Sequence, residues 1–304
     1  MRVWWRFAIG RIRGKRVGTH WIAAAAARGD PAAGAGLPGG PPHSQNAAMA
    51  EHPVRILTMP LDGIEEPDLA PLLAVLDATE RARAARFAFA HSRVPFVAAH
   101  ALTRAALSRL VAAPASAWGF VPGPHGKPAP LLGGVAAPVS FNLSHTRGMV
   151  GVALTARPDA LLGFDLEAAA REVTPRISES VFRPEERAWL ASLPAEHWRC
   201  GFLRLWTLKE AFIKATGRGL AQGLDSFWFE LPPPRIRFAA PGPTRPEHWL
   251  FGQRLLRGTH HAAVGLHAEG RAPAILWEET NLALLLRELA APQPGQSRAL
   301  LRPD

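Results

Sequence analysis

The chain has 304 residues, 48% of them hydrophobic, which is enough to bury a large core as one domain or two small ones. Its formal charge of +10 would suggest nucleic acid, but residues 1–48 hold seven of the 35 basic residues and only one of the 25 acidic residues. The rest of the chain is therefore not basic enough to indicate a nucleic-acid-binding surface. The single cysteine, Cys200, excludes an internal disulfide bond and a multi-cysteine zinc site, and it is typical of a reducing, cytoplasmic compartment.

Residues 1–48 resemble neither a clean signal peptide nor a folded domain. The apolar stretch Trp21–Ala27 is short and lacks a small-residue cleavage site, and no apolar run approaches the ~18 residues of a membrane span. Alanine, glycine and proline dominate residues 23–42, which is linker composition. We expect an N-terminal extension that is disordered or follows from a mis-assigned start, with the domain beginning at Met49; a transit-like segment is the less favoured alternative.

From Met49 onward, strand and helix patterns are interspersed. In the first half they predict a strand, three helices and, after a proline-rich loop, two strands: 54–59; 67–76, 79–87 and 96–110; 139–144 and 149–154. Pro95 is expected to mark a break or the first turn of the third helix.

In the second half the patterns predict one strand, two helices, five short strands and a last helix: 161–167; 184–193 and 197–216; 226–231, 235–239, 249–256, 261–267 and 274–278; 281–289. Helix beside strands in each half indicates an α+β fold. We interpret it as two similar α/β subdomains, residues 49–158 and 159–290, followed by a loose tail at 291–304.

The helix at 197–216 is the most informative stretch. Its apolar residues recur at the spacing of a buried stripe, and Gly217 stands where a left-handed C-terminal cap is expected. Glu210 and Lys214 are four residues apart and share a face beside that stripe, which also fits an ordinary surface ion pair. However, the chain has only four lysines, Lys15, Lys127, Lys209 and Lys214, and an ammonium group can meet a phosphate or donate a proton where guanidinium does so poorly.

Asp165 and Glu167 are two residues apart in a predicted strand, so both carboxylates point to one face. Paired carboxylates repel unless a cation lies between them, and hard oxygen ligands of this kind suit Mg²⁺. Glu210 could supply a third carboxylate if the long helix packs on the strand. The alternative is a strand that ends in exposed acids.

Other polar clusters lack the motifs of serine hydrolases, P-loop nucleotide sites and metal sites. Asn142–Thr146 lacks the Gly-x-Ser-x-Gly of a serine hydrolase, and Gly123–Lys127 lacks Walker A spacing. Three histidines in or directly before the penultimate predicted strand make no recognised metal constellation, and strand alternation accounts for them: His260, His261 and His267.

The polar groups together suit a polyphosphate ligand, and their motifs resemble a known family. Phe141–Thr146, Gly163–Glu167 and Trp206–Lys214 are similar, in order and spacing, to motifs of the long, monomeric, surfactin-synthetase-activating 4'-phosphopantetheinyl transferases. Weaker likenesses are Arg83–Phe87, Gly126–Pro128 and the acidic turn Phe182–Glu186. The resemblance spans roughly residues 75 to 225.

The resemblance implies a monomeric enzyme that moves the 4'-phosphopantetheine arm of coenzyme A onto a serine of an apo acyl or peptidyl carrier protein. It implies a pseudo-twofold pair of subdomains with the active site in the cleft between them. Mg²⁺ would be held by Asp165, Glu167 and Glu210; Glu210, alone or through a water, would take the serine proton. Lys214 would neutralise the pyrophosphate. Coenzyme A would further contact Arg83, Lys127, Ser144 and His145.

Two departures from the family pattern stand out. Pro95 occupies a position that is commonly arginine, and Leu166, between the two acids, is apolar and cannot be a ligand. A non-catalytic coenzyme A-binding paralogue is the alternative, but it would be expected to lose an acid or Lys214, and all are present. A nucleic-acid-binding protein is favoured only by the overall charge.

Overall fold

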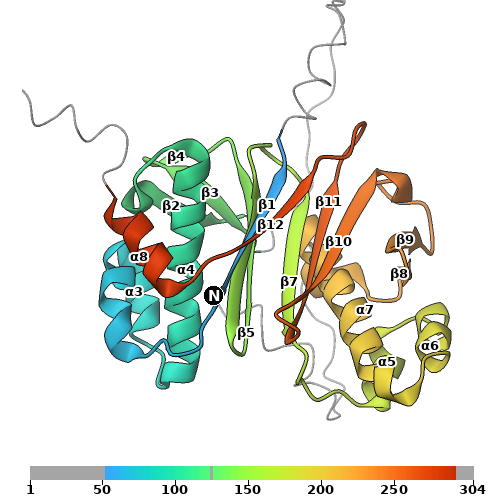
Figure 1. Ribbon diagram of the computed structural model, residues 1–304. Helices are drawn as coiled ribbons and strands as arrows, with labels where there is room; N and C mark the ends of the chain where they lie inside the picture. Colours follow the sequence, from blue (N-terminus) through green and yellow to red (C-terminus); the bar gives the residue numbers. More distant parts are fainter. Residues whose placement is uncertain (1–51, 124–125, 292–304) are drawn as a thin grey trace, which may run out of the picture. The chain divides into compact units, whose positions relative to one another are not determined.

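The computed structural model describes residues 52–123 and 126–291, which all belong to one unit, Ser44–Asp304 (Figure 1). The predicted extension at residues 1–48 and nearly all of the predicted tail lie outside the described residues. The described chain is a mixed α+β fold with several sheets, in agreement with the sequence patterns.

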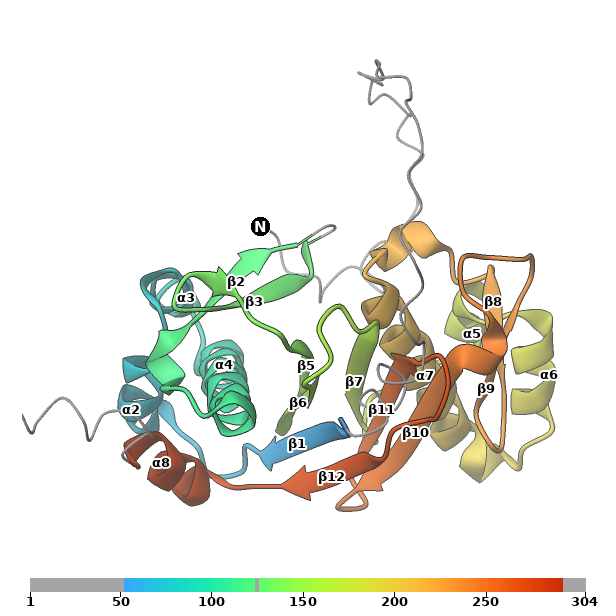
Figure 2. The same cartoon turned by 90° about the horizontal axis from the view of Figure 1, so that it is seen from above.

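The first half is built on a four-stranded sheet in the order β12-β1-β6-β5, in which β12 (Ile275–Glu279) comes from the end of the chain. Strand β1 (Val54–Pro60) runs antiparallel to β6 (Met149–Thr155), which runs antiparallel to β5 (Ser140–Thr146). Helix α4 (Ala90–Val111) lies against one face of this sheet (Figure 2). Its alanine- and leucine-rich surface packs against the apolar side chains of β5 and β6 and forms the core of this half.

A small three-stranded sheet replaces the loop that was predicted between the helices and β5. It has the order β2-β3-β4, with β2 at Trp118–Pro122, β3 at Pro128–Leu132 and β4 at Val135–Ala136. Both prolines are typical of loops in the sequence. In the structure Pro122 and Pro128 pair with each other at the end of β2 and the start of β3, so neither interrupts the hydrogen bonds between these strands. The remaining elements of this half are η1 (Glu66–Asp68), α2 (Leu69–Ala74), α3 (Ala78–Ala84) and η2 (Ala115–Ala117).

The prediction of a break or a first-turn position at Pro95 is wrong, because α4 begins at Ala90 and Pro95 is its sixth residue. Pro95 lies beyond the four amides that lack an intrahelical partner, so the helix continues without the one bond that this amide would donate to the carbonyl of His91. The ring is buried with the rest of this helix face.

The second half is built on a three-stranded antiparallel sheet in the order β10-β11-β7. Its strands are β7 (Leu162–Ala168), β10 (Trp249–Leu256) and β11 (His260–His267). The long helix α7 (Ala195–Thr216) packs on it and ends at Gly217 with φ 68°, the left-handed cap that the sequence predicted. Around this frame lie α5 (Pro175–Val181), which was not predicted, α6 (Pro184–Ala191), η4 (Gly219–Gln222), β8 (Phe227–Glu230), β9 (Arg235–Phe238) and η5 (Pro246–His248).

The two halves repeat one order of elements. Each has a first strand, then a helix of 22 residues, a small antiparallel accessory sheet and a β-hairpin whose second strand pairs with the first strand. The equivalent elements are β1 and β7, α4 and α7, β5 and β10, and β6 and β11.

The end of the chain returns to the first half. Strand β12 (Ile275–Glu279) pairs in parallel with β1, and α8 (Leu282–Ala290) buries Leu285 in the core beside α4 (Figure 1). The division into subdomains at residues 158 and 159 stays a prediction.

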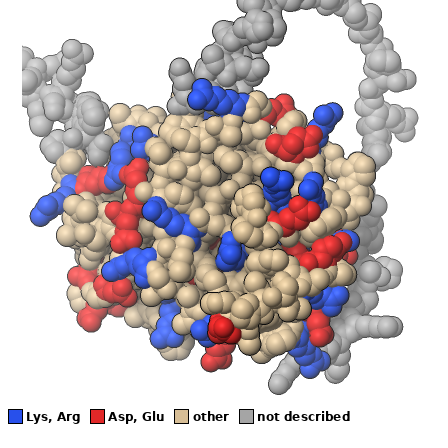
Figure 3. Space-filling model, turned by 45° about the vertical axis from the view of Figure 1, so that its right-hand side comes forward, with Lys and Arg blue, Asp and Glu red and all other residues tan. Residues whose placement is uncertain are grey.

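None of the helices in the described ranges is long and apolar enough to cross a membrane. On the face drawn in Figure 3, basic and acidic side chains are interspersed rather than gathered by sign.

Candidate active site

The two sheets meet along β5 and β7, and side chains take the place of a backbone ladder there. Every second residue of β5 accepts, through its side-chain oxygen, a hydrogen bond from a backbone amide of the second half: Ser140, Asn142 and Ser144. Asn142 Oδ1 accepts from the amide of Phe164 at 2.8 Å, and Ser144 Oγ accepts from the amide of Leu166 at 3.2 Å. These bonds satisfy edge-strand amides that would otherwise lack a partner. The contact between β5 and β7, called the seam below, is therefore polar and has a fixed register.

Gly163 brings helix α7 close to this seam. A Cβ built on it would lie 1.9 Å from the carbonyl oxygen of Ala211 and 2.4 Å from the amide nitrogen of Ala215. Any side chain here would push the helix off the strand. The glycine thus lets the side chains of Glu210 and Lys214 reach the polar residues of β7.

Asp165 and Lys214 form the centre of the site. Lys214 Nζ lies 2.6 Å from Asp165 Oδ1, and it also donates to Ser144 Oγ at 3.1 Å and to the carbonyl of Phe164 at 3.2 Å. The other carboxylate oxygen, Asp165 Oδ2, is buried and has no hydrogen-bond partner in the part of the chain that the structure describes. A buried carboxylate oxygen without a donor is costly, and a bound cation would satisfy it.

Glu210 lies one helical turn before Lys214 and shares its surroundings. Burial, and then the nearby Asp165 carboxylate, raises the pKa of Glu210 to about 7, while Lys214 and Arg171 oppose the shift. A carboxyl group whose pKa lies near neutrality can both take and release a proton under ordinary conditions. The influence of Asp165 and Lys214 on this pKa agrees with a shared face for Glu210 and Lys214.

Glu167 points to the same face of β7 as Asp165, as the two-residue spacing predicted. Its Oε1 accepts a hydrogen bond from Trp206 Nε1 on α7 at 3.0 Å and forms an ion pair with Arg171. The guanidinium of Arg171 also lies over the indole ring of Trp206, 5.7 Å from its centroid. Leu166 points to the opposite face and is fully buried in the core, so it takes no part in the carboxylate cluster.

Cationic and potentially cationic side chains surround His145 on β5. Burial, followed by the charges of Lys214, His100 and Arg83, lowers the pKa of His145 to about 4. Arg83 on α3 lies over the ring of Phe96 at 5.1 Å, and His100 on α4 is hydrogen-bonded to Glu80 at 2.6 Å. Several cationic or potentially cationic groups thus converge from four elements, which suits a phosphate ligand.

Lys127 stands at the other end of β7. Its Nζ donates to the carbonyl of Leu162 at 2.9 Å and to that of Ala215, near the end of α7, at 3.3 Å. Burial lowers the pKa of Lys127 to about 8. The lysine connects the first half of the chain to the second.

Lys209 directly precedes Glu210 and is rotated about 100° from it on a helix, which predicts a position at the edge of the cleft, and this prediction is wrong. Its side chain is fully buried, forms an ion pair with Glu186 at 3.0 Å and donates to the carbonyls of Leu224 and Phe227. Glu186, the last residue of the predicted acidic turn, also accepts from two backbone amides. Burial raises the pKa of Glu186 and lowers that of Lys209, each opposed by its partner. The pair is therefore part of the core of the second half.

The structure brings together several of the residues that the sequence singled out, and Arg171 links Glu167 to them: Ser144, His145, Asp165, Glu210 and Lys214. Sequence reasoning missed Arg171, Trp206 and His100, which contact or lie near these residues. Trp206 stood inside a quoted motif, but Arg171 and His100 had no local signal because their role depends on which element packs beside them.

Comparison with known proteins agrees with this geometry. A model of the 4'-phosphopantetheinyl transferase superfamily matches residues 161–265. The chain is 33% identical over 184 residues to the 4'-phosphopantetheinyl transferase HetI of Nostoc sp., which covers 60% of this chain and 76% of that protein. It is 42% identical over 87 residues to psf-1 of Bacillus pumilus, and 33% identical over 87 residues to Sfp of Bacillus subtilis. These two alignments cover 29% of this chain, and 36% and 37% of those proteins.

The chain therefore belongs to the 4'-phosphopantetheinyl transferase superfamily. It is an enzyme that transfers the 4'-phosphopantetheine group of coenzyme A to carrier proteins, and its relatives include the surfactin-synthetase-activating type that the sequence motifs indicated.

Proposed function

We propose that the transfer takes place at the seam of β5, β7 and α7, in the cleft between the two halves of a pseudo-twofold fold. The observation that carries this proposal is Asp165, whose Oδ1 is paired with Lys214 while the buried Oδ2 lacks a hydrogen-bond partner among residues 52–123 and 126–291. A metal ligand with one oxygen fixed by a lysine and the other unsatisfied is poised to receive a cation.

Mg²⁺ would be held by Asp165, Glu167 and Glu210. These residues fit Mg²⁺ because carboxylate oxygens are the ligands that this ion prefers. A bound cation would also compensate the buried oxygen of Asp165, Oδ2, that has no hydrogen-bond partner among the described residues. When bound, the ion supplies neutralisation of the pyrophosphate oxygens. Without the ion, Arg171 offsets part of the negative charge of the carboxylates, because it pairs with Glu167.

The reaction is a displacement at the β-phosphorus of the coenzyme A pyrophosphate. The serine oxygen of the carrier protein forms a bond to that phosphorus, the bridging P–O bond breaks, and adenosine 3',5'-bisphosphate departs with the electron pair. Glu210, directly or through a water, takes the serine proton, for which its raised pKa suits it. Lys214 neutralises charge on the pyrophosphate and the departing bisphosphate.

Coenzyme A would be bound by the cations around β5. The Arg83 guanidinium and the His145 ring, together with Ser144 and Lys214, would contact its phosphates and nucleotide, and Lys127 would hold the 3'-phosphate end. Supporting this is the convergence of charge around His145 from α3, α4 and α7. In this proposal Lys127 exchanges one of its two carbonyl partners for a phosphate oxygen.

The partner would be an apo acyl or peptidyl carrier protein, and the enzyme would act as a monomer in the cytoplasm. Incubation of a panel of apo carrier proteins with the full chain, coenzyme A and Mg²⁺, followed by intact-mass measurement, tests the assignment. We expect one phosphopantetheine group per accepted carrier, located on a serine, and none in excess chelator. Undiminished modification in excess chelator would overturn the metal role.

A further inference from the structure

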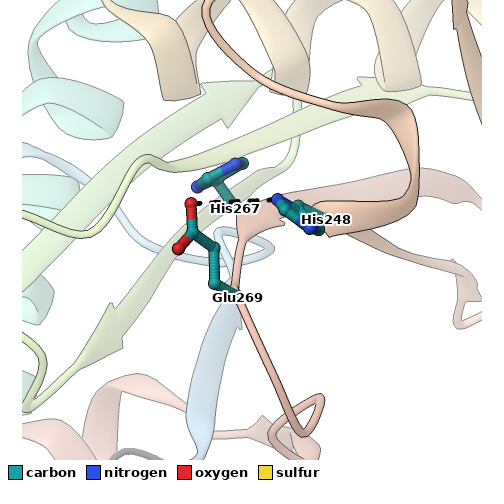
Figure 4. A group of neighbouring side chains, drawn as sticks. All are labelled: His248, His267 and Glu269. Carbon is teal, nitrogen blue, oxygen red and sulfur yellow. Dashed lines mark ion pairs between the residues drawn. The ribbon is translucent and has the colours of Figure 1, made fainter.

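Three potential metal ligands meet at the open end of the β10–β11 hairpin, outside the site described above. His248 immediately precedes β10, His267 ends β11, and Glu269 follows in the next loop. One ligand atom from each lies within 4.8 Å of the others. Figure 4 shows the three side chains converging, with His248 and Glu269 joined as an ion pair.

The hairpin itself positions the two histidines. Trp249 pairs with His267 across the strands, and the amide of Ala268 donates to the carbonyl of His248 at 2.8 Å. The two imidazole rings meet edge to face with centroids 5.7 Å apart, and His267 also packs against Trp249 at 5.3 Å. The backbone and the indole therefore restrict both rings before any ligand is bound.

One ring nitrogen in this group lacks a partner. His267 Nε2 is buried and makes no hydrogen bond within the described residues. Burying a polar nitrogen without a partner costs free energy, and coordination to a cation would remove that cost. His248 Nδ1 lies 3.8 Å from Glu269 Oε1, too far for a hydrogen bond, so these groups do not satisfy each other either.

We propose that His248, His267 and Glu269 form a binding site for a divalent transition-metal ion such as Zn²⁺. Two imidazoles and one carboxylate are a donor set that Zn²⁺ accepts, with water in the fourth position. Ligands at zinc distances lie roughly 3.3 Å apart in a tetrahedron, so the group must close slightly. The side chain of Glu269 is 71% exposed and can make that movement. The guanidinium of Arg157, near His267, opposes cation binding, and the Glu269 carboxylate offsets it.

This group is separate from the carboxylates of the active site. Asp165 pairs with Ala263 on β11, four residues before His267, which is roughly 13 Å along a strand. The ligand classes also differ, because the carboxylate site offers only oxygen donors, which suit Mg²⁺, whereas imidazole nitrogen selects transition metals. An ion at this second site would tie the open end of the hairpin to the following loop.

Zinc binding by the purified full-length, tag-free protein tests the proposal. Calorimetric titration with Zn²⁺ in millimolar Mg²⁺, which occupies the carboxylate site, should give one bound equivalent. Co²⁺ used in its place should produce visible absorption bands from the nitrogen ligands. H248Q and H267Q should each weaken zinc binding by at least about tenfold, whereas E269Q, at an exposed position that folding does not require, should weaken it several-fold.

The matched control is H197Q, which removes an exposed histidine from the first turn of α7 and should leave the titration unchanged. Zinc should also raise the melting temperature of the wild-type protein and of H197Q but not that of H248Q. The proposal is overturned if no saturable equivalent binds in the presence of Mg²⁺. It is equally overturned if H248Q, H267Q and E269Q all bind zinc as the wild type does.

Discussion

Helix α7 carries two lysine–carboxylate pairs that are five residues apart and serve different purposes. Lys209 and Glu186 are both fully buried, and every remaining donor of the lysine meets a carbonyl or an aromatic ring. Lys214 and Asp165 form a shorter pair, at 2.6 Å against 3.0 Å, but the lysine is partly exposed and one oxygen of the carboxylate has no hydrogen-bond partner among the described residues. The first pair is closed, whereas the second is open to a ligand.

The difference indicates how a structural ion pair can be told from one that we propose to bind a ligand. Both pairs match the same local sequence pattern, a lysine beside acids in a family motif. What separates them is the completeness of their hydrogen bonding. A closed pair contributes to folding, because removing one partner leaves a buried charge. An open pair retains binding capacity, because a substrate or an ion can complete it.

Asp165→Ala should have the largest effect in the open pair. We expect at least about a 10³-fold loss of transfer, the upper range for removing one preorganised charge-stabilising group. The variant should still fold, because the Glu210 carboxylate still balances the positive charge of Lys214. Carrier modification measured by intact mass, beside a circular dichroism melt, checks both statements. Glu172→Ala, an exposed acid nearby, serves as the control and should retain activity; near wild-type turnover of the Asp165 variant would contradict the site.

Lys209→Ala should break the closed pair and reduce stability. Leaving Glu186 buried without its cation should lower the free energy of unfolding by about 3–5 kcal/mol, measured by urea denaturation. Turnover per folded molecule should change little. If this variant were as stable as the wild type but lost turnover, Lys209 would belong to the active site after all.

Lys214→Ala should give the reverse profile. We expect a loss of at least about 2 kcal/mol of transition-state stabilisation in kcat/KM with a smaller change in stability than Lys209→Ala. Lys214→Arg should recover little, since a planar guanidinium cannot replace a compact ammonium among Asp165, Ser144 and the Phe164 carbonyl. Steady-state kinetics on the three lysine variants decides between the two profiles.

The metal-free protein should lose stability as the pH rises from about 5 to 8. The pKa of Glu210 is raised to about 7 in the folded state, above its ordinary value of 4.5, so the folded state binds more protons than the unfolded state in this window. The loss should be on the order of 1–3 kcal/mol. Chemical denaturation across this pH range in chelator measures it, and Glu210→Gln should flatten the slope. An unchanged slope in that variant would assign the titration to another group.

Arg171→Gln should have the smallest effect, on the affinity for metal rather than on folding. Arg171 pairs with Glu167 and lies near Asp165 and Glu210, so its removal should tighten Mn²⁺ binding roughly fivefold, about 1 kcal/mol. Electron paramagnetic resonance titration measures free Mn²⁺ directly, without turnover. Arg176→Gln, at an exposed arginine, is the matched control; weaker binding in the Arg171 variant would mean that the arginine supports the cluster instead of competing with the ion.

The sequence by itself determined the local elements and the orientation of nearby side chains. The buried stripe of α7 and its glycine cap, the shared face of Asp165 and Glu167, and the shared face of Glu210 and Lys214 all follow from helical and strand periodicity. Most strands and helices of the second half were predicted within a few residues for the same reason. The activity was predicted from the family motifs.

Only the tertiary structure decided which neighbours those faces meet. Periodicity rotates Lys209 by about 100° from Glu210 but does not say whether that side faces solvent or the buried Glu186. In the same way, the β5–β7 seam, the approach of α7 at Gly163 and the meeting of His248 with His267 join residues far apart in the chain. Such contacts depend on which elements pack together, and that is a property of the whole core rather than of any local pattern.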